Sequence, residues 1–287
     1  MILPYTDFGG DGPPLVFLHA NGYPPACYLP LIERLKSHHH VLAPHMRPLW
    51  PHARPEEIGA WHPLSDDLML FLDEHKIEQA QVVGHSMGAI VSLRASIRKP
   101  ERFQAQVLID PVLFRRRFIA LSFITKLLGL TSRFHPLVQS ARKRRRQFDD
   151  LDKLFASYRR KHIFHYMDDE ALRIYITGIT RPAAAGGFEL VYSPEWESRI
   201  YETGIIADLD LWFGLPKLKV PTLVLRGAET DTFLPPAAKR LQQANPAIRV
   251  ETLEKTTHLL PLETPQKVHQ HIQGFLTNTL ANQQPGD

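Results

Sequence analysis

The stretch Gln81-Val82-Val83-Gly84-His85-Ser86-Met87-Gly88-Ala89 decides the fold. Val82 and Val83 predict a buried strand, and a helix is expected to begin near Met87. Ser86, the serine of a G-x-S-x-G pattern, would therefore lie on a sharp strand-to-helix turn. A strained turn of this kind requires neighbours without side chains, which Gly84 and Gly88 supply. The start of the helix would also direct free N–H groups toward the serine. The pattern therefore predicts a nucleophile at Ser86.

Strands and helices alternate on both sides of this turn. Apolar runs predict strands at residues 5–8, 15–19, 39–44, 106–110, 222–226 and 249–253. Helices are expected over residues 26–35, 65–75, 87–99, 236–244 and 265–280, with Ser65 as the N-cap of the second. This alternation predicts the α/β class, with a doubly wound and mostly parallel sheet.

The pattern changes between residues 111 and 214, which read as mostly helical. Residues 111–165 contain fourteen Lys and Arg against three Asp and Glu, although the whole chain carries a net charge of only +4. We therefore expect a core made of residues 1–110 and 215–287, and a basic helical lid made of residues 111–214.

Two segments of the lid have alternative interpretations. Residues 118–130 predict a lid helix over the pocket; the alternative is an interfacial helix, flanked by the arginines at 115–117, on an anionic membrane. The five cations at residues 142–146 predict a solvated helix face, or else a docking site for phosphate or a membrane. Nucleic acid is not expected as a partner, because no aromatic platform or binding motif accompanies the charge.

Composition is that of an ordinary globular protein, with 44% apolar and 22% charged residues. The single cysteine, Cys27, excludes an internal disulfide and favours a reducing compartment, and we expect it to be buried. The N-terminal sequence lacks a secretory signal, and no stretch approaches the roughly 18 apolar residues that span a bilayer. The sequence predicts a cytoplasmic protein, with contact at the inner face of the membrane as a further hypothesis.

A serine nucleophile requires a base and an acid, and two loops supply candidates. His258 follows the last predicted strand, and Asp231 lies just past the strand before it. Loops beyond the carboxyl ends of parallel strands gather at one edge of the sheet, so Ser86, Asp231 and His258 are expected to meet there. Asp110, which closes the strand at residues 106–110, is the alternative acid.

Three motifs together resemble the α/β-hydrolase-fold serine hydrolases of the esterase and lipase type. They are Gly-His-Ser-Met-Gly, a Val-Pro-Thr-Leu-Val-Leu strand followed by Gly-x-x-x-Asp, and a late His followed by Pro and Glu. The resemblance covers roughly residues 10–110 and 215–280. It implies an oxyanion hole formed by the backbone N–H groups of Met87 and Asn21. Ala20 replaces a usual glycine there, which leaves Gly22 as an alternative donor. Residues 46–49 also depart from the family's Asp-x-Arg-Gly, which bears on the shape of that loop.

The implied activity is hydrolysis of a lipophilic or aromatic carboxylic ester through an acyl-enzyme on Ser86. Carbon–carbon bond hydrolysis on the same triad, or a ligand-binding receptor on the same scaffold, are the alternatives. Epoxide-hydrolase and dehalogenase chemistry would need a carboxylate in place of Ser86. No cofactor or metal is expected, because the histidines at 38–40 are consecutive and alternate between the two faces of a strand. His19 is predicted to brace a loop.

Overall fold

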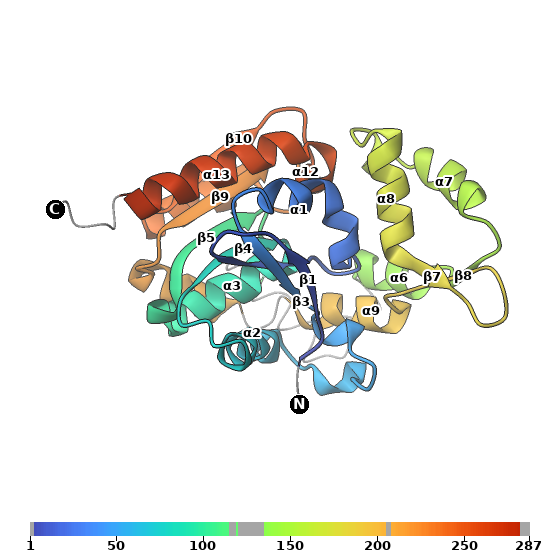
Figure 1. Cartoon of the computed structure of the whole chain (residues 1–287), viewed down its shortest axis with the longest axis horizontal. Helices are drawn as coiled ribbons and strands as arrows, with labels where there is room; N and C mark the ends of the chain where they lie inside the picture. The colour runs from blue at the N-terminus through green and yellow to red at the C-terminus, as the bar shows by residue number, and fades with distance from the viewer. Residues whose placement is uncertain (1–2, 115–118, 120–134, 205–207, 282–287) are drawn as a thin grey trace.

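The computed structural model describes residues 3–114, 119, 135–204 and 208–281. Its centre is a seven-stranded sheet in the order β1-β3-β2-β4-β5-β9-β10 (Figure 1). The strands are β1 (Tyr5–Gly9), β2 (Pro14–Leu18), β3 (His40–Pro44), β4 (Ala80–His85), β5 (Phe103–Ile109), β9 (Thr222–Gly227) and β10 (Arg249–Leu253). The pairing of β1 with β3 is antiparallel and the other five pairings are parallel. The predicted α/β class and mostly parallel sheet are confirmed.

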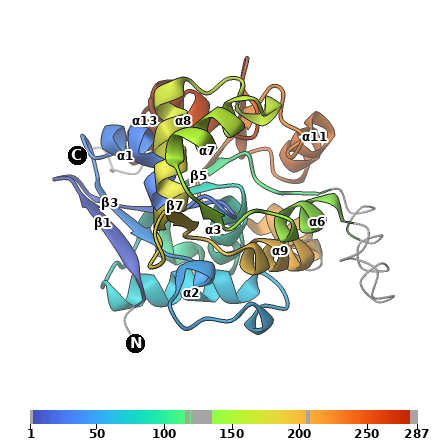
Figure 2. The same cartoon turned by 90° about the vertical axis from the view of Figure 1, so that its right-hand side faces the viewer.

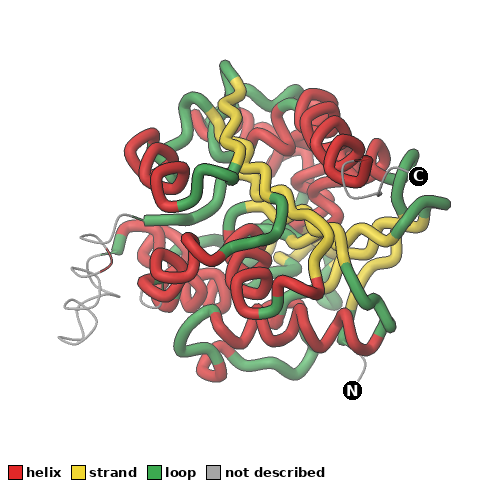
Figure 3. The backbone as a smooth tube through the Cα atoms, turned by 90° about the vertical axis from the view of Figure 1, so that its left-hand side faces the viewer, coloured by secondary structure: helices red, strands yellow, loops and turns green. Residues whose placement is uncertain are grey.

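Helices cover both faces of this sheet, as Figures 1 and 3 show. One face carries α1 (Leu29–Leu35), α12 (Leu260–Glu263) and α13 (Pro265–Ala281); the other carries α2 (His62–Glu74), α3 (Met87–Arg98) and α11 (Pro235–Ala244). Every residue of β4 is buried, because a central parallel strand is covered on both sides. Among the described residues, the connections contain the 3₁₀ turns η1 (Pro25–Tyr28), η2 (Arg47–Leu49), η3 (Pro55–Glu57), η4 (Pro100–Arg102), η5 (His162–Phe164) and η6 (Leu215–Lys217).

An insertion separates β5 from β9 and lies to one side of the sheet (Figure 2). It contains α6 (Pro136–Arg142), α7 (Leu151–Arg159), α8 (Asp169–Ile179), α9 (Pro194–Thr203) and α10 (Leu209–Gly214). It also contains the short strands β6 (Gln147–Phe148), β7 (Thr180–Pro182) and β8 (Phe188–Leu190), which form a three-stranded antiparallel sheet. The sequence indicated the helices but not these strands, because two or three residues are too few to show a period of two.

The insertion packs directly on the core. A Cβ atom on Gly178 of α8 would lie 2.8 Å from the backbone nitrogen of Cys27, so only glycine permits this approach. The indole of Trp61 donates a hydrogen bond to the carbonyl of Ile200 in α9 at 3.1 Å. Cys27 is buried, as the sequence predicts, and burial raises the pKa of its thiol, which keeps the thiol protonated and unreactive.

Two local predictions are wrong. Helix α2 begins at His62 rather than near Ser65, because Pro63 occupies its first turn, where proline is favoured. Ser65 is a buried interior residue whose hydroxyl has no described partner, so it does not cap the helix.

The basic run at residues 142–146 is not a helix face, since α6 ends at Arg142. Its alternate arginines reach across to three glutamates of α9. The pairs are Arg142 with Glu202, Arg144 with Glu197, and Arg146 with Glu195, while Arg145 pairs with Asp149. The charge is solvated, as the sequence suggested, since four of the five cations are exposed and Arg144 is partly buried. The run is not a helix face, however, and its alternate arginines form ion pairs with α9.

The predicted lid helix at 118–130 and the arginines at 115–117 lie outside the described residues, apart from Ile119, which is buried. Within the described part of the chain, no helix combines the length and apolarity needed to cross a bilayer.

Candidate active site

The turn between β4 and α3 holds Ser86 in a strained backbone conformation, with φ 56° and ψ −111°. Two glycines permit this turn. A Cβ atom on Gly84 would lie 2.6 Å from the carbonyl carbon of Gly88, and one on Gly88 would lie 2.3 Å from the carbonyl oxygen of Leu18. The strand and the helix can therefore cross beside the serine only because both positions lack side chains.

Three side chains form a continuous hydrogen-bonded line at the carboxyl edge of the sheet. Ser86 Oγ lies 3.0 Å from His258 Nε2, and His258 Nδ1 lies 2.7 Å from Asp110 Oδ2. A carboxylate only accepts, so Nδ1 carries the proton toward Asp110 and Nε2 is left to accept from the serine hydroxyl. The structure thus brings Ser86 and His258 together, as the sequence predicts.

The predicted acid, Asp231, does not reach the histidine. It is exposed, and its carboxylate accepts a hydrogen bond from the Thr232 hydroxyl at 3.1 Å. Asp110, the alternative from the sequence, holds the place beside His258 instead. The two side chains differ in burial: Asp110, at the end of β5, is fully buried beside His258, whereas Asp231, past the end of β9, is exposed to solvent.

Asp110 is fully buried and its carboxylate is held by the end of β9. Oδ2 accepts from the Thr230 hydroxyl at 2.5 Å as well as from His258, and Oδ1 accepts from the Gly227 backbone at 3.2 Å. Three donors offset the cost of burying a carboxylate and fix its plane. The residue also has a positive φ of 41°, which places it among the four strained non-glycine positions of the described chain.

The two expected oxyanion donors come from different elements of the core. Met87 is the first residue of α3, and Asn21 lies in the loop after β2. Neither backbone N–H donates a hydrogen bond to any described residue, so both remain available to a ligand. The Asn21 side chain is buried, and its Nδ2 donates to the Glu197 carbonyl of α9 at 3.1 Å, which links this loop to the insertion.

His19 braces the same loop, as predicted. Its Nε2 accepts from the Met46 backbone at 3.2 Å, and its Nδ1 donates to the Ala20 carbonyl at 2.8 Å. Burial lowers the pKa of His19 to about 4, so the ring is neutral near pH 7. It serves structure and not proton transfer.

A second buried histidine connects the oxyanion loop to the base. The Tyr28 hydroxyl accepts from the Ala20 backbone at 3.1 Å and lies 2.8 Å from His85 Nδ1, while His85 Nε2 lies 2.9 Å from the His258 carbonyl. A carbonyl only accepts, so Nε2 is protonated and the tyrosine donates to Nδ1. Burial lowers the pKa of His85 well below its usual value and keeps this tautomer. The sequence pointed to His85 only as a member of the serine motif.

In the described part of the chain, no group of three His, Cys, Asp or Glu side chains is arranged to hold a metal ion. Of the consecutive histidines, His39 is turned inward toward Gln273 and His40 pairs with Asp7, as expected for alternate faces of a strand.

Comparisons with known proteins agree with this fold. The model of the alpha/beta hydrolase family matches residues 15–271. The chain is 24% identical over 275 residues to (E)-2-((N-methylformamido)methylene)succinate hydrolase of Acinetobacter baylyi, covering 94% of this chain and 92% of that protein. Epoxide hydrolase A of Mycobacterium tuberculosis is 36% identical over 107 residues, about a third of each chain. The solved structure of E-2-(acetamidomethylene)succinate hydrolase superposes with a TM-score of 0.77 at 20% identity, over 96% of this chain and 95% of the other.

Proposed function

Because this chain belongs to the alpha/beta hydrolase family, we propose that it is a serine hydrolase that cleaves a carboxylic ester through an acyl-enzyme on Ser86. The observation that carries the proposal is the line of hydrogen bonds from Ser86 Oγ through His258 to Asp110, at 3.0 and 2.7 Å. Nucleophile, base and acid in this order are the arrangement that activates a hydroxyl for acyl transfer.

The chemistry proceeds in two halves. Ser86 Oγ attacks the carbonyl carbon while His258 Nε2 takes the hydroxyl proton, and the negative oxygen is held by the N–H groups of Met87 and Asn21. The tetrahedral intermediate collapses, the C–O bond of the ester breaks, and His258 returns the proton to the departing alcohol. Water then attacks the acyl-enzyme by the same route and releases the acid. Asp110 stabilises the imidazolium that forms in each half.

The serine at the elbow distinguishes this proposal from the epoxide-hydrolase chemistry of the family. Epoxide opening through an alkyl-enzyme needs a carboxylate at the elbow, where this chain has Ser86. The Acinetobacter relative, by its name, acts on a substituted methylenesuccinate, and we take from it that the acyl group need not be a simple fatty acid. Carbon–carbon bond hydrolysis would use the same three side chains, and a ligand-binding receptor would use the pocket alone.

Contact with an anionic membrane is not part of the proposal. Four of the five cations at residues 142–146 are already paired with carboxylates, which removes most of the charge that such a surface would attract. We retain a reducing, cytoplasmic location as a proposal, supported by one buried cysteine that has no partner for a disulfide within the chain.

A fluorophosphonate probe tests the nucleophile directly, because it phosphonylates an activated serine whatever the natural substrate. We expect stoichiometric labelling at Ser86, no labelling of Ser86→Ala, and turnover of at least one p-nitrophenyl ester in a series from acetate to decanoate. Folding of the variant is checked by its melting temperature. A folded wild-type protein that is neither labelled nor active on any ester would overturn the proposal, and ligand binding without turnover would favour a receptor.

A further inference from the structure

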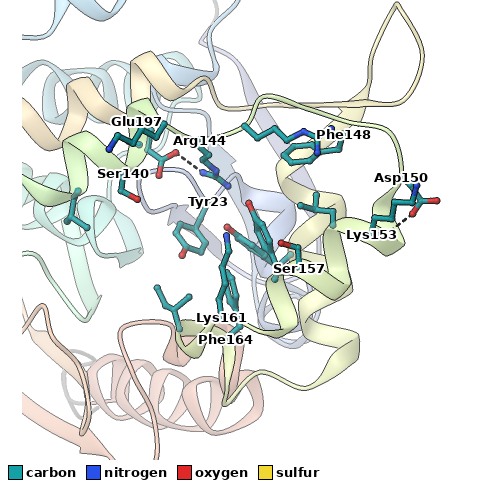
Figure 4. A pocket seen from close by; sticks show the side chains of 18 of the residues that line it. Tyr23, Ser140, Arg144, Phe148, Asp150, Lys153, Ser157, Lys161, Phe164 and Glu197 are labelled. Carbon is teal, nitrogen blue, oxygen red and sulfur yellow. Dashed lines mark hydrogen bonds and ion pairs between the residues drawn. The ribbon is translucent and has the colours of Figure 1, made fainter.

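A pocket of about 660 Å³ lies between the insertion and the loop after β2 (Figure 4). Its walls come from α6, α7, α8, α9 and η5, and the core contributes Tyr23. Its lining mixes apolar side chains, such as Leu154 and Phe164, with charged and hydroxyl-bearing ones, among them Arg144, Lys161, Glu197 and the tyrosines at 158, 175 and 201. A pocket with this lining suits an acyl group that also carries a polar or charged group, rather than the purely lipophilic chain that the sequence suggested.

The pocket adjoins the oxyanion loop. Glu197 lines the pocket, and its backbone carbonyl accepts a hydrogen bond from the side chain of Asn21. A Cβ atom on Gly22, the next residue, would lie 3.6 Å from Arg144 Nη1. The ring of Tyr23 packs edge-on against the His85 ring, with centroids 6.4 Å apart. A ligand in this pocket would therefore lie against the loop that carries Asn21.

Arg144 is the principal cation of this pocket. Its side chain is only 16% exposed, and its one hydrogen bond to a described residue runs from Nη1 to Glu197 Oε2 at 2.6 Å. A guanidinium carries five N–H donors in a planar fork that matches a carboxylate. Most of that fork is left without a described acceptor, and Figure 4 shows the guanidinium directed into the pocket.

Lys161 adds a second cation at the mouth of the pocket. Its ammonium lies 3.7 Å from the centre of the Tyr158 ring, and among the described residues it forms no ion pair with a carboxylate. Partial burial and the nearby charge of Arg144 lower the pKa of Lys161. In Figure 4 the nitrogen ends of Lys161 and Arg144 point toward each other beside Tyr23. Two like charges held together at a partly dry site are stabilised when an anion binds between them.

We propose that Arg144 and Lys161 bind a free carboxylate carried by the substrate, so that the preferred ester is a half-ester of a dicarboxylic acid. The inference rests on the proposed function and names its substrate class. Glu197 pairs with Arg144, so Arg144 and Lys161 together with this carboxylate carry one net positive charge toward the ligand.

Paired substrates with one leaving group test the preference. The p-nitrophenyl half-esters of glutaric and adipic acid are compared with their methyl-capped counterparts, which have the same chain but no charge, after subtraction of spontaneous hydrolysis. We expect kcat/KM to be at least 10-fold higher for the charged member of each pair. Equal or reversed values, with measurable turnover of the neutral esters, would refute the inference while the proposed function stands.

Lys161→Met removes one charge without disturbing a described ion pair. We expect the ratio of kcat/KM for the charged ester to kcat/KM for its neutral counterpart to fall about 10-fold, mainly because KM of the charged ester rises. Lys161→Arg should restore most of the ratio. The matched control is Lys239→Met, which makes the same change on the exposed side of α11 and should keep the wild-type ratio. An unchanged ratio in Lys161→Met would count against the carboxylate site.

Binding to Ser86→Ala separates failure of this inference from failure of the catalytic proposal. Calorimetry should show glutarate binding to the variant and no binding of dimethyl glutarate, with weaker glutarate binding when Lys161→Met is added. Glutarate should also inhibit ester turnover competitively, which identifies the anion site as part of the substrate site. No binding of glutarate, or inhibition that is not competitive, would overturn the inference even if Ser86 labels as expected.

Discussion

Replacement of Asp110 by asparagine tests the geometry of the site most sharply, because it changes one atom at the end of the hydrogen-bonded line. The new amide keeps the shape of the carboxylate, and its oxygen can still accept from the Gly227 backbone. Its NH₂ group, however, now faces His258 Nδ1 at the position where Oδ2 accepts at 2.7 Å. A donor there selects the tautomer with the proton on Nε2, which cannot accept the proton of Ser86.

The size of the effect follows from that tautomer. Loss of the correct tautomer in a serine triad lowers kcat by about 10⁴, equivalent to ~5 kcal/mol in the activation free energy. We therefore expect Asp110→Asn to lower kcat of ester hydrolysis by 10³- to 10⁴-fold with little change in KM, and to slow fluorophosphonate labelling of Ser86 by a similar factor. Stability should fall only modestly, since the Thr230 hydroxyl can rotate to accept from the new amide.

Asp231→Asn is the matched control, because this exposed carboxylate has no hydrogen bond to the histidine. Its kcat should stay within about 2-fold of the wild type. Burst and steady-state kinetics on one p-nitrophenyl ester measure both variants. If Asp231→Asn were the inactive protein and Asp110→Asn retained full activity, the assignment of the acid from the structure would be refuted.

Three further predictions concern the frame around the triad. Gly88→Ala should lower the free energy of unfolding, measured in urea, by more than ~2 kcal/mol, because the new Cβ would lie 2.3 Å from the Leu18 carbonyl oxygen. Gly274→Ala is the control: its new Cβ would lie in open space, and it should stabilise α13 by up to about 1 kcal/mol. Equal effects of the two substitutions would contradict the close packing of Gly88 on β2. The pKa of His19 in the folded protein is about 4, below the ordinary value of about 6.5, so the contribution of this residue to stability is complete above pH 6.5 and is lost as the pH falls toward 4. The free energy of unfolding should therefore drop by about 2 kcal/mol between pH 7.5 and pH 5 from this residue alone. This pH dependence of stability should become weaker in His19→Gln. Tyr28→Phe should cost about 1–3 kcal/mol of stability, because it leaves a buried imidazole nitrogen without its donor; a thermal melt no different from wild type would contradict the hydrogen-bonded chain.

Much of the core could be predicted from apolar runs and turn residues. A strand that is buried on both faces tends toward a continuous apolar sequence, and β2, β4, β5 and β9 each contain an apolar run, although buried glutamines interrupt β4 and β5. The pair of glycines around Ser86 allowed the strained turn to be predicted for the same physical reason that the structure shows: no side chain fits there.

The acid of the site could not be chosen from the sequence, because Asp110 and Asp231 both follow a strand of the same sheet. Sequence order does not reveal that the Asp110 side chain is buried against His258 Nδ1 while the Asp231 side chain is exposed. The choice depends on where each side chain lies, which only the folded chain provides.

The ion pairs of the basic run in the insertion could not be predicted for a similar reason. Charge counts show cations but not the carboxylates that face them, and the partners of Arg142, Arg144 and Arg146 lie on α9, far along the chain. Only the folded insertion shows that Arg144 lies beside a pocket, which a sequence pattern does not indicate.

The nucleophile and the acid are attached to two adjacent strands. The Ser86 backbone donates to the carbonyl of Ile109, the last residue of β5, at 2.9 Å, and Asp110 follows directly. The distance between them is thus fixed by the ladder spacing, roughly 4.8 Å between strands, and the insertion begins only after the acid. Under the proposed function, the atoms that break the bond therefore belong to the core. An insertion taken from another hydrolase would then change the substrate preference and keep the chemistry, provided that it preserves the contact of the Glu197 carbonyl with Asn21.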